Sequence, residues 1–274
     1  MSRPAVSAIV VSYQTGPRLK ECLYALSADP DVSEIVLVDN GNPEKMRDWI
    51  AVFGKTRPHM AVISGQGNIG FGAAVNLGVK QSSGAHVLVI NPDAVIRWGS
   101  VPSMQSAASG LISPWIVGGK IFDISGQEER GGRRRRLTLA RAITGALGWN
   151  TWTLEKTAPP TGVVDMPVIS GAFFLTSKTS LEALGGFDEG YFLHVEDVDL
   201  CRRCWDANGR VLYDPGAAVL HYGSTSDAPN GIVQAHKADS LARYFRKFAK
   251  GAFERGLVEM TIPLMRFGLW LARR

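Results

Sequence analysis

The sequence predicts an α/β fold built on a mostly parallel sheet. Short runs of β-branched residues alternate with helical stretches through the first half of the chain, as is typical of βα units. The runs at residues 6–13, 34–40, 60–64 and 85–94 are apolar almost throughout, which indicates parallel strands buried on both faces. The chain has 274 residues and 45% hydrophobic content, enough to bury a substantial core.

The remaining elements follow from apolar spacing and from glycine and proline. Residues 16–28 carry apolar side chains at helical spacing, and residues 68–82 predict a loop followed by a helix. Beyond residue 94 we expect strands at 115–123 and 165–177, a short helix ended by glycine at 178–186, and two short strands about a Pro-Gly turn within 209–223. The Gly/Arg-rich segment 124–138 predicts a mobile loop.

The C-terminal segment predicts amphipathic helices. One apolar face is formed by Leu241, Tyr244, Phe245 and Phe248. Residues 256–274 are apolar but interrupted by Glu259, Pro263 and Arg266, so they are too short and too charged to span a bilayer. Docking on the core and lying at a membrane surface both stay open. We therefore expect one domain over residues 1–226 and a basic helical extension over residues 227–274.

Positive charge is concentrated in two places. From Lys237 onward nine Lys and Arg residues stand against three acids, so this tail carries +6 and residues 1–236 carry −1 of the total of +5. Five further arginines lie between residues 130 and 136, where they could form a lid over phosphates or a solvated loop. This distribution argues against a nucleic-acid partner and favours local contacts with phosphate or an anionic membrane surface.

Cysteine usage indicates a reducing compartment. Cys22, Cys201 and Cys204 give no even disulfide framework, and no cleavable signal precedes the first apolar run, so we expect a cytoplasmic protein. Cys201 and Cys204 form a C-x-x-C pair without a second pair to complete a zinc site. Buried thiols on a helix are therefore the expectation.

Polar residues follow three of the predicted parallel strands, at the end of the sheet where α/β proteins bind ligands. The first strand ends at Ser12 and Tyr13, the second at Asp39 and Asn40, and the fourth at Asp93. A carboxylate at 39 suits a nucleobase or ribose group, although the Asn-Gly pair at 40–41 equally predicts a plain turn. A carboxylate at 93 suits a divalent ion that binds a pyrophosphate, although a Pro-Asp turn is also common.

The stretch "GNIGFG" at residues 67–72 precedes a predicted helix N-terminus. Its glycines permit close approach of a ligand to the backbone, and the helix start favours an anion. The stretch lacks the spacing of a dinucleotide fingerprint. It predicts a nucleotide-lining loop that includes Asn68 and Gly70.

The stretch "EDVD" at residues 196–199 begins a predicted helix. The helix dipole stabilises acids in a first turn, and Asp199 is placed to pair with Arg203 one turn later. Adjacent Glu196 and Asp197 raise each other's pKa, which suits one of them to accept a proton from a hydroxyl group. His221 ends the last apolar run, where either a structural role or metal ligation is open.

An ordered set of segments resembles the motifs of family 2 glycosyltransferases, most closely a bacterial branch described as rhamnosyltransferase-like. The segments are "VSAIVVSYQT", "EIVLVDNGN", "GNIGFGAAVNLGV", "VLVINPDA", "VISGAFFLTSKTSLEALGGFDEGYFLHVEDVDLCRR" and "VLYDPGAAVLHYGST", within residues 5–226. The resemblance implies the GT-A fold, in which a Rossmann-like nucleotide-binding sheet joins an acceptor-binding half. It also implies inversion at the anomeric carbon.

The resemblance assigns roles to individual residues. Asp39 would contact the base or ribose, and Asp93 would be the last acid of a D-x-D metal motif that here is Asn91-Pro92-Asp93, without its first acid. His221 would join Asp93 at the metal, which would be Mn²⁺ or Mg²⁺.

The same resemblance places the chemistry on the "EDVD" and "SGAFF" motifs. Asp197 would be the general base with Glu196 beside it. Gly171 and Ala172 would belong to the loop at the acceptor and donor sugar.

The sequence and the resemblance together imply an inverting sugar transferase. It would move a sugar, with rhamnose from dTDP-rhamnose suggested by the branch, from a nucleotide diphosphate donor to a saccharide or lipid-linked acceptor in surface polysaccharide synthesis. We expect it at the inner face of a bacterial plasma membrane, and a homo-oligomer stays open. Two alternatives are a nucleotidyltransferase, for which only Arg18 and Lys20 stand near the first strand, and a non-catalytic membrane-associated scaffold.

Overall fold

The computed structural model describes residues 5–129, 131–146, 158–223 and 230–271. A nine-stranded sheet runs in the order β3-β2-β1-β4-β10-β6-β11-β5, with β8 beside β11, and β7 pairs with β9 in a separate small sheet. The strands are β1 (Val6–Ser12), β2 (Glu34–Asp39), β3 (Met60–Ile63), β4 (His86–Ile90), β5 (Ala94–Ile96), β6 (Trp115–Phe122), β7 (Arg133–Arg134), β8 (Val164–Asp165), β9 (Val168–Ile169), β10 (Phe173–Ser177) and β11 (Arg210–His221).

The strand directions confirm the predicted parallel half. β3, β2, β1 and β4 are parallel to their neighbours. β10 then runs antiparallel between β4 and β6, while β11 is parallel to β6. The C-terminal ends of β1, β2, β4, β6 and β11 therefore share one edge of the sheet with the first residue of β10.

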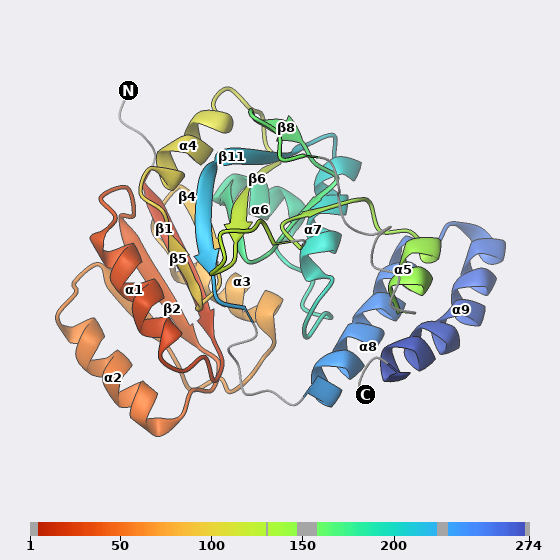
Figure 1. Cartoon of the computed structure of the whole chain (residues 1–274), viewed down its shortest axis with the longest axis horizontal. Helices are drawn as coiled ribbons and strands as arrows, with labels where there is room; N and C mark the ends of the chain where they lie inside the picture. The colour runs from red at the N-terminus through yellow and green to blue at the C-terminus, as the bar shows by residue number, and fades with distance from the viewer. Residues whose placement is uncertain (1–4, 130, 147–157, 224–229, 272–274) are drawn as a thin grey trace.

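Helices cover both faces of the sheet (Figure 1). They are α1 (Arg18–Ala28), α2 (Glu44–Lys55), α3 (Phe71–Gln81), α4 (Ser100–Ala107), α6 (Lys178–Leu184) and α7 (Glu196–Asp206). Alternate residues of β1 enter different cores: Ala8 and Val10 pack on the side of α1, whereas Ile9 and Val11 pack on the side of α3. This two-sided burial explains why the parallel strands are continuously apolar.

β11 differs from the prediction of two short strands about a Pro-Gly turn. It is one strand whose register against β6 shifts between Asp214 and Ala218. Asp214 accepts hydrogen bonds from the backbone N–H of Gly216 at 2.8 Å and from the hydroxyl of Ser103 at 2.6 Å. These contacts accommodate the extra residues as a bulge, so the chain keeps its direction to His221.

Three further helices form a layer beside α7, opposite α1 and α2 (Figure 1). They are α5 (Leu139–Ala146), α8 (Asn230–Phe248) and α9 (Gly251–Leu271). The predicted apolar face of α8 is buried through Leu241, Tyr244 and Phe245. No helix in the described ranges is long and apolar enough to cross a membrane. The expected boundary between residues 226 and 227 lies outside those ranges.

Cys201 and Cys204 lie on α7, and both thiols are buried and unpaired, as predicted. Burial raises the pKa of each thiol to about 12. Both are therefore protonated at neutral pH and serve as small apolar groups in the core.

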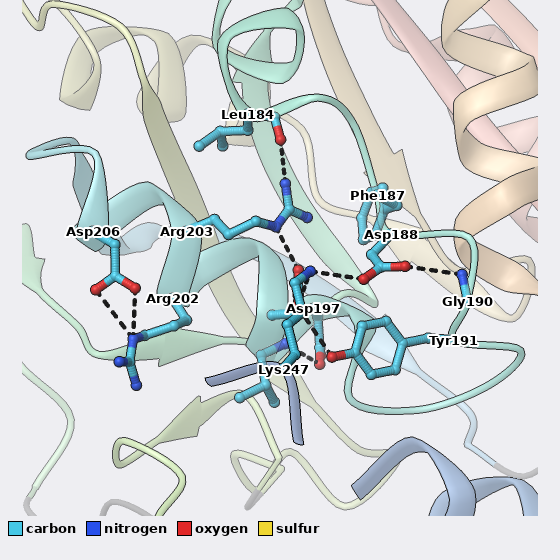
Figure 2. Close-up of polar contacts among 12 residues, drawn as sticks. Leu184, Phe187, Asp188, Gly190, Tyr191, Asp197, Arg202, Arg203, Asp206 and Lys247 are labelled. Carbon is cyan, nitrogen blue, oxygen red and sulfur yellow. Dashed lines mark hydrogen bonds and ion pairs between the residues drawn. The ribbon is translucent and has the colours of Figure 1, made fainter. Parts of the chain in front are cut away.

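A buried ionic network ties α8 to α7 (Figure 2). The Asp199 side chain is fully buried and accepts hydrogen bonds from Arg203 Nε at 2.5 Å, Lys247 Nζ at 2.7 Å and the Tyr191 hydroxyl at 3.1 Å. The predicted pairing of Asp199 with Arg203 is thus confirmed. Lys247 also reaches Asp188 at 2.7 Å, so the network fixes the loop that precedes α7.

We predict that Asp199→Ala lowers the free energy of unfolding by about 3 kcal/mol or more, because it leaves Arg203 and Lys247 without the buried carboxylate. Urea denaturation followed by circular dichroism measures the change. Asp206→Ala is the matched control, since it removes a half-exposed carboxylate that pairs with Arg202 on the same helix, and it should cost less than about 1 kcal/mol. Equal losses in the two variants would contradict the structural role of Asp199.

Candidate active site

The loop after β2 is organised around Asp39. Its Oδ1 accepts hydrogen bonds from the backbone N–H groups of Gly41 at 3.0 Å and Asn42 at 2.8 Å, and from Asn42 Nδ2 at 2.9 Å. Gly41 has φ +124°, which a side chain would strain, and a Cβ there would lie 3.3 Å from the Tyr13 ring. Asp39 therefore does stabilise a turn, as one of its two predicted roles required.

Asn40 joins this loop to the glycine-rich loop before α3. Its Nδ2 donates to Asn68 Oδ1 and to the Gly70 carbonyl oxygen, both at 3.2 Å. The Asn40 Oδ1 atom is buried without a hydrogen-bond partner in the described part of the chain. The Ser12 hydroxyl is also buried and donates a hydrogen bond to Asn42 Oδ1 at 3.1 Å. This bond links the end of β1 to the loop after β2.

Asp93 and His221 meet at the same edge of the sheet. His221 Nε2 lies 3.2 Å from Asp93 Oδ1, and His221 Nδ1 lies 2.7 Å from Glu129 Oε1. Burial alone would lower the pKa of His221, but the hydrogen bonds with Asp93 and Glu129 raise it to about 9. Without another cation, the imidazole therefore carries a proton between two carboxylates at neutral pH.

The side chains of Asp93 and His221 carry atoms that can bind a divalent cation. A carboxylate oxygen and an imidazole nitrogen that face each other are ligands that Mn²⁺ accepts, and Glu129 on the second ring nitrogen would orient the imidazole. Within the described ranges, no group of three or more His, Cys, Asp or Glu side chains is arranged to hold a metal ion. Asp93 and His221 would thus be a partial ligand set that needs oxygen ligands from substrate or water.

The "SGAFF" loop connects this cluster to Asp197. The backbone N–H of Asn91 donates to the Ala172 carbonyl oxygen at 2.8 Å, and the backbone N–H of Gly171 donates to Asp197 Oδ2 at 2.8 Å. The space beside Gly171 is tight, since a Cβ at this position would lie 3.2 Å from Asp197 Cβ. The loop that contains Gly171 and Ala172 is therefore bonded to Asp197 through Gly171 and to the segment that leads to Asp93 through Ala172.

Asp197 is held by three donors. Oδ2 accepts from Gly171 and from Arg134 Nη2, and Oδ1 accepts from the backbone N–H of Val198 at 2.7 Å. Burial lowers the pKa of Arg134, but the Asp197 charge outweighs it and raises that pKa, so the guanidinium stays charged. A carboxylate has about four acceptor positions. The fourth, on Oδ1, is where an incoming hydroxyl group can donate its proton.

Glu196 differs sharply from its neighbour. Its Oε2 is buried and has no hydrogen-bond partner in the described residues. Burial and the charge of Asp197 raise the pKa of Glu196 to about 8, so this carboxyl is mostly protonated at neutral pH. Of the two adjacent acids, Asp197 is therefore the one with the hydrogen bonds of an ionised carboxylate.

The turn that enters α7 is strained. His194 and Val195 have φ +66° and +71°, in the left-handed region that β-branched residues rarely occupy. This sharp turn places Glu196 and Asp197 at the helix N-terminus, where the backbone of Val198 can meet the carboxylate. Such strain is common where a structure must hold functional groups in place.

A cavity of about 490 Å³ lies beside Asp197, which is one of its lining residues. Its walls come from the segment around β7, from α5, from the start of α7, and from α8 and α9. The lining residues are Arg134, Arg135, Arg136, Leu137, Arg141, Ala142, Gly145, Val168, His194, Val195, Glu196, Asp197, Val198, Lys237, Leu241 and Leu269. Of the residues predicted from the sequence, Glu196 and Asp197 line it, while Asp39, Asp93 and His221 do not.

The sequence did not predict the partners of His221 and Asp197, which are Glu129 and Arg134. Glu129 and Arg134 lie in the segment expected to be a mobile loop. That segment instead contains β7, and Arg133 binds Glu128 through two hydrogen bonds of 2.8 and 2.9 Å. The arginine run was a visible signal, but its pairing with β9 depends on residues more than 30 positions away.

Comparison with known proteins identifies the family. The family model described as glycosyl transferase family 2 matches residues 7–185. The chain is 30% identical to the N-acetylglucosaminyl-diphospho-decaprenol L-rhamnosyltransferase of Mycobacterium tuberculosis, over 83% of this chain and 80% of that protein. It is 26% identical to Rhamnosyltransferase WbbL of Escherichia coli K12, over 78% of this chain and 82% of that protein.

Solved structures share the fold. The mannosyltransferase PcManGT of Pyrobaculum calidifontis, in complex with GDP-Man and Mn²⁺, matches with a TM-score of 0.60 and 17% identity, over 99% of this chain and 74% of that one. GalNAc-T7 with UDP, GalNAc and Mn²⁺ matches with a TM-score of 0.63 and 14% identity, over 97% of this chain but only 55% of that one. The architecture is GT-A, as the resemblance implied. Because the family match covers more than half of the sequence, the chain belongs to glycosyl transferase family 2 and is a glycosyltransferase.

Proposed function

We propose that the protein is an inverting transferase that moves a sugar, with rhamnose as the first candidate, from a nucleotide diphosphate to a lipid-linked saccharide. The names of the two rhamnosyltransferase relatives support the sugar, and the name of the Mycobacterium tuberculosis relative supports the acceptor class. The observation that carries the mechanism is the Asp197 carboxylate, which lines the cavity and accepts three hydrogen bonds from the described residues, one fewer than its acceptor positions.

Asp197 is proposed to act as the general base. An acceptor hydroxyl donates to the open position of Oδ1, and its proton passes to that oxygen as the hydroxyl oxygen bonds to the anomeric carbon. The bond between that carbon and the diphosphate breaks, and the nucleotide leaves as an anion, so no general acid is required. Gly171 and Val198 fix the carboxylate orientation through their N–H groups, which supplies the alignment that in-line attack needs.

The edge of the sheet is proposed to bind the donor. The loops carrying Asp39, Asn40, Asn68 and Gly70 would hold the nucleoside. The buried Asn40 Oδ1, which has no hydrogen-bond partner among the described residues, is an acceptor that a base could use. Tyr13 and Ser12 support these loops from the end of β1. Asp93 and His221 would hold a divalent cation, which when bound would offset the charge of the diphosphate.

We predict that a nucleotide diphosphate sugar and Mn²⁺ together raise the melting temperature more than either does alone, and that acceptor addition releases a nucleoside diphosphate. A thermal-shift screen of nucleotide sugars, followed by product analysis, measures both. Asp93→Asn should remove the Mn²⁺-dependent part, whereas Asp165→Asn, at an exposed surface pair, should not. Release of pyrophosphate would instead support a nucleotidyltransferase. Failure to bind any nucleotide diphosphate would support the scaffold alternative.

We further propose that α9 rests on an anionic membrane surface. Phe253, Leu257, Met260, Leu264 and Phe267 recur every three or four residues and are all exposed, with Phe253 at 81% and Met260 at 74%. The opposite face of α9 is buried through Val258, Ile262, Met265 and Leu269. A helix with two apolar faces needs a second apolar partner, and the exposed Lys250 and Arg255 nearby favour anionic lipid.

We predict that the full chain co-sediments with vesicles of phosphatidylcholine and phosphatidylglycerol, and that the double variant Phe253→Ser, Met260→Ser loses most of this binding. The loss follows from the apolar area removed from the stripe. Ile112→Ser is the matched control, because Ile112 is an apolar residue outside α9 with 87% exposure, and this variant should bind vesicles as the unaltered chain does. Equal retention of all three proteins would leave α9 as a helix that packs only on the core.

A further inference from the structure

The cavity beside Asp197 gathers more positive charge than its carboxylates balance. Five cationic side chains line it, from Arg134, Arg135, Arg136, Arg141 and Lys237. Arg134 is matched by Asp197, while the other acid in the wall, Glu196, is mostly protonated at neutral pH. No ion pair joins Arg136, Arg141 or Lys237 to a carboxylate of the described residues, so these three cations favour a ligand with two or more negative charges.

Part of the cavity wall is buried, since Glu196, Leu241 and Leu269 are each at most 7% exposed. Reduced solvation, with the charge of Arg134, lowers the pKa of Lys237. Hydrogen bonds from a guanidinium or ammonium group to an anion are strongest where water is excluded.

Apolar side chains form the rest of the wall. Leu137, Ala142, Val168, Leu241 and Leu269 line the cavity beside the cationic groups. A free sugar or a nucleotide has no large apolar part to place against them. An amphiphile with an anionic head and a hydrocarbon chain satisfies both surfaces.

The position of the cavity relates it to the reaction and to α9. Asp197 is part of its wall, so a sugar attached directly to a group bound there would lie beside this carboxylate. Leu269 faces the cavity from the buried side of α9, whose exposed side carries Phe253 and Met260. One helix thus borders both the cavity and the apolar stripe.

We propose that this cavity binds the diphosphate and the first isoprenoid units of the acceptor. Arg136, Arg141 and Lys237 face the phosphate oxygens, and Leu137, Leu241 and Leu269 face the hydrocarbon. The assignment rests on the proposed function, since it names the acceptor class of that transferase. It also places the acceptor diphosphate on the far side of Asp197 from Asp93, where the donor diphosphate binds.

Isothermal titration calorimetry with farnesyl diphosphate tests this site in the full chain without any sugar transfer. Lys237→Gln and Arg141→Gln should each weaken binding about tenfold, the loss expected when one hydrogen bond to a charged group is removed. Arg141→Lys should retain much of the affinity, which separates loss of charge from misfolding. Lys55→Gln, which removes an exposed cation at the end of α2 outside the cavity, is the control and should bind as the unaltered chain does.

Two further titrations identify which diphosphate the cavity takes. Inorganic pyrophosphate should bind more weakly than farnesyl diphosphate, and equal binding would overturn the role of the apolar wall. dTDP should bind without displacing farnesyl diphosphate, and competition would assign the cavity to the donor. Farnesyl diphosphate binding that is insensitive to Lys237→Gln and Arg141→Gln would overturn the site itself.

Failure of this site is distinguishable from failure of the proposed function. Normal sugar transfer with no binding of farnesyl diphosphate refutes the cavity assignment alone. Binding that depends on Lys237 and Arg141, in a protein that transfers no sugar, refutes the proposed function and leaves the site as a binding site for prenyl diphosphates.

Discussion

The Asp197 carboxylate accepts hydrogen bonds from two parts of the molecule that are far apart in the sequence, the backbone N–H of Gly171 and the guanidinium of Arg134. Gly171 belongs to the loop that also binds Asn91 through Ala172, at the edge of the main sheet. Arg134 belongs to the cationic cavity on the other side. A single side chain therefore connects the sheet edge proposed for the donor to the cavity proposed for the acceptor.

Environment rather than residue type separates the roles of the two adjacent acids. Asp197 accepts hydrogen bonds from three donors, whereas Glu196 Oε2 is buried and has no partner among the described residues. Burial and the neighbouring charge favour the neutral form of Glu196. The strained turn at His194 and Val195 directly precedes both acids, which begin α7.

Features set by local pattern could be predicted from the sequence. The meeting of Asp93 with His221 was expected from the resemblance to family 2 glycosyltransferases and not from local pattern. The parallel strands, by contrast, follow from their apolar runs. The pair of Asp199 and Arg203 follows from helical spacing alone. These inferences need no knowledge of contacts between distant segments.

Features set by distant contacts could not be predicted. Arg134 reaches Asp197 only because β7 pairs with β9, and a composition rich in glycine and arginine conceals that pairing. Likewise the bulge in β11 depends on Ser103, which lies 111 residues before Asp214. Glu129 is similar, since its partner His221 is 92 residues away.

The central claim is that Asp197 takes the proton of the acceptor hydroxyl. The most direct measurement compares kcat for sugar transfer, and the affinity for the nucleotide sugar, between the unaltered protein and Asp197→Asn. The substitution preserves size but removes the proton-accepting oxygen charge. We predict a loss of kcat of about a hundredfold or more with nearly unchanged donor binding. Full activity of Asp197→Asn would contradict the account.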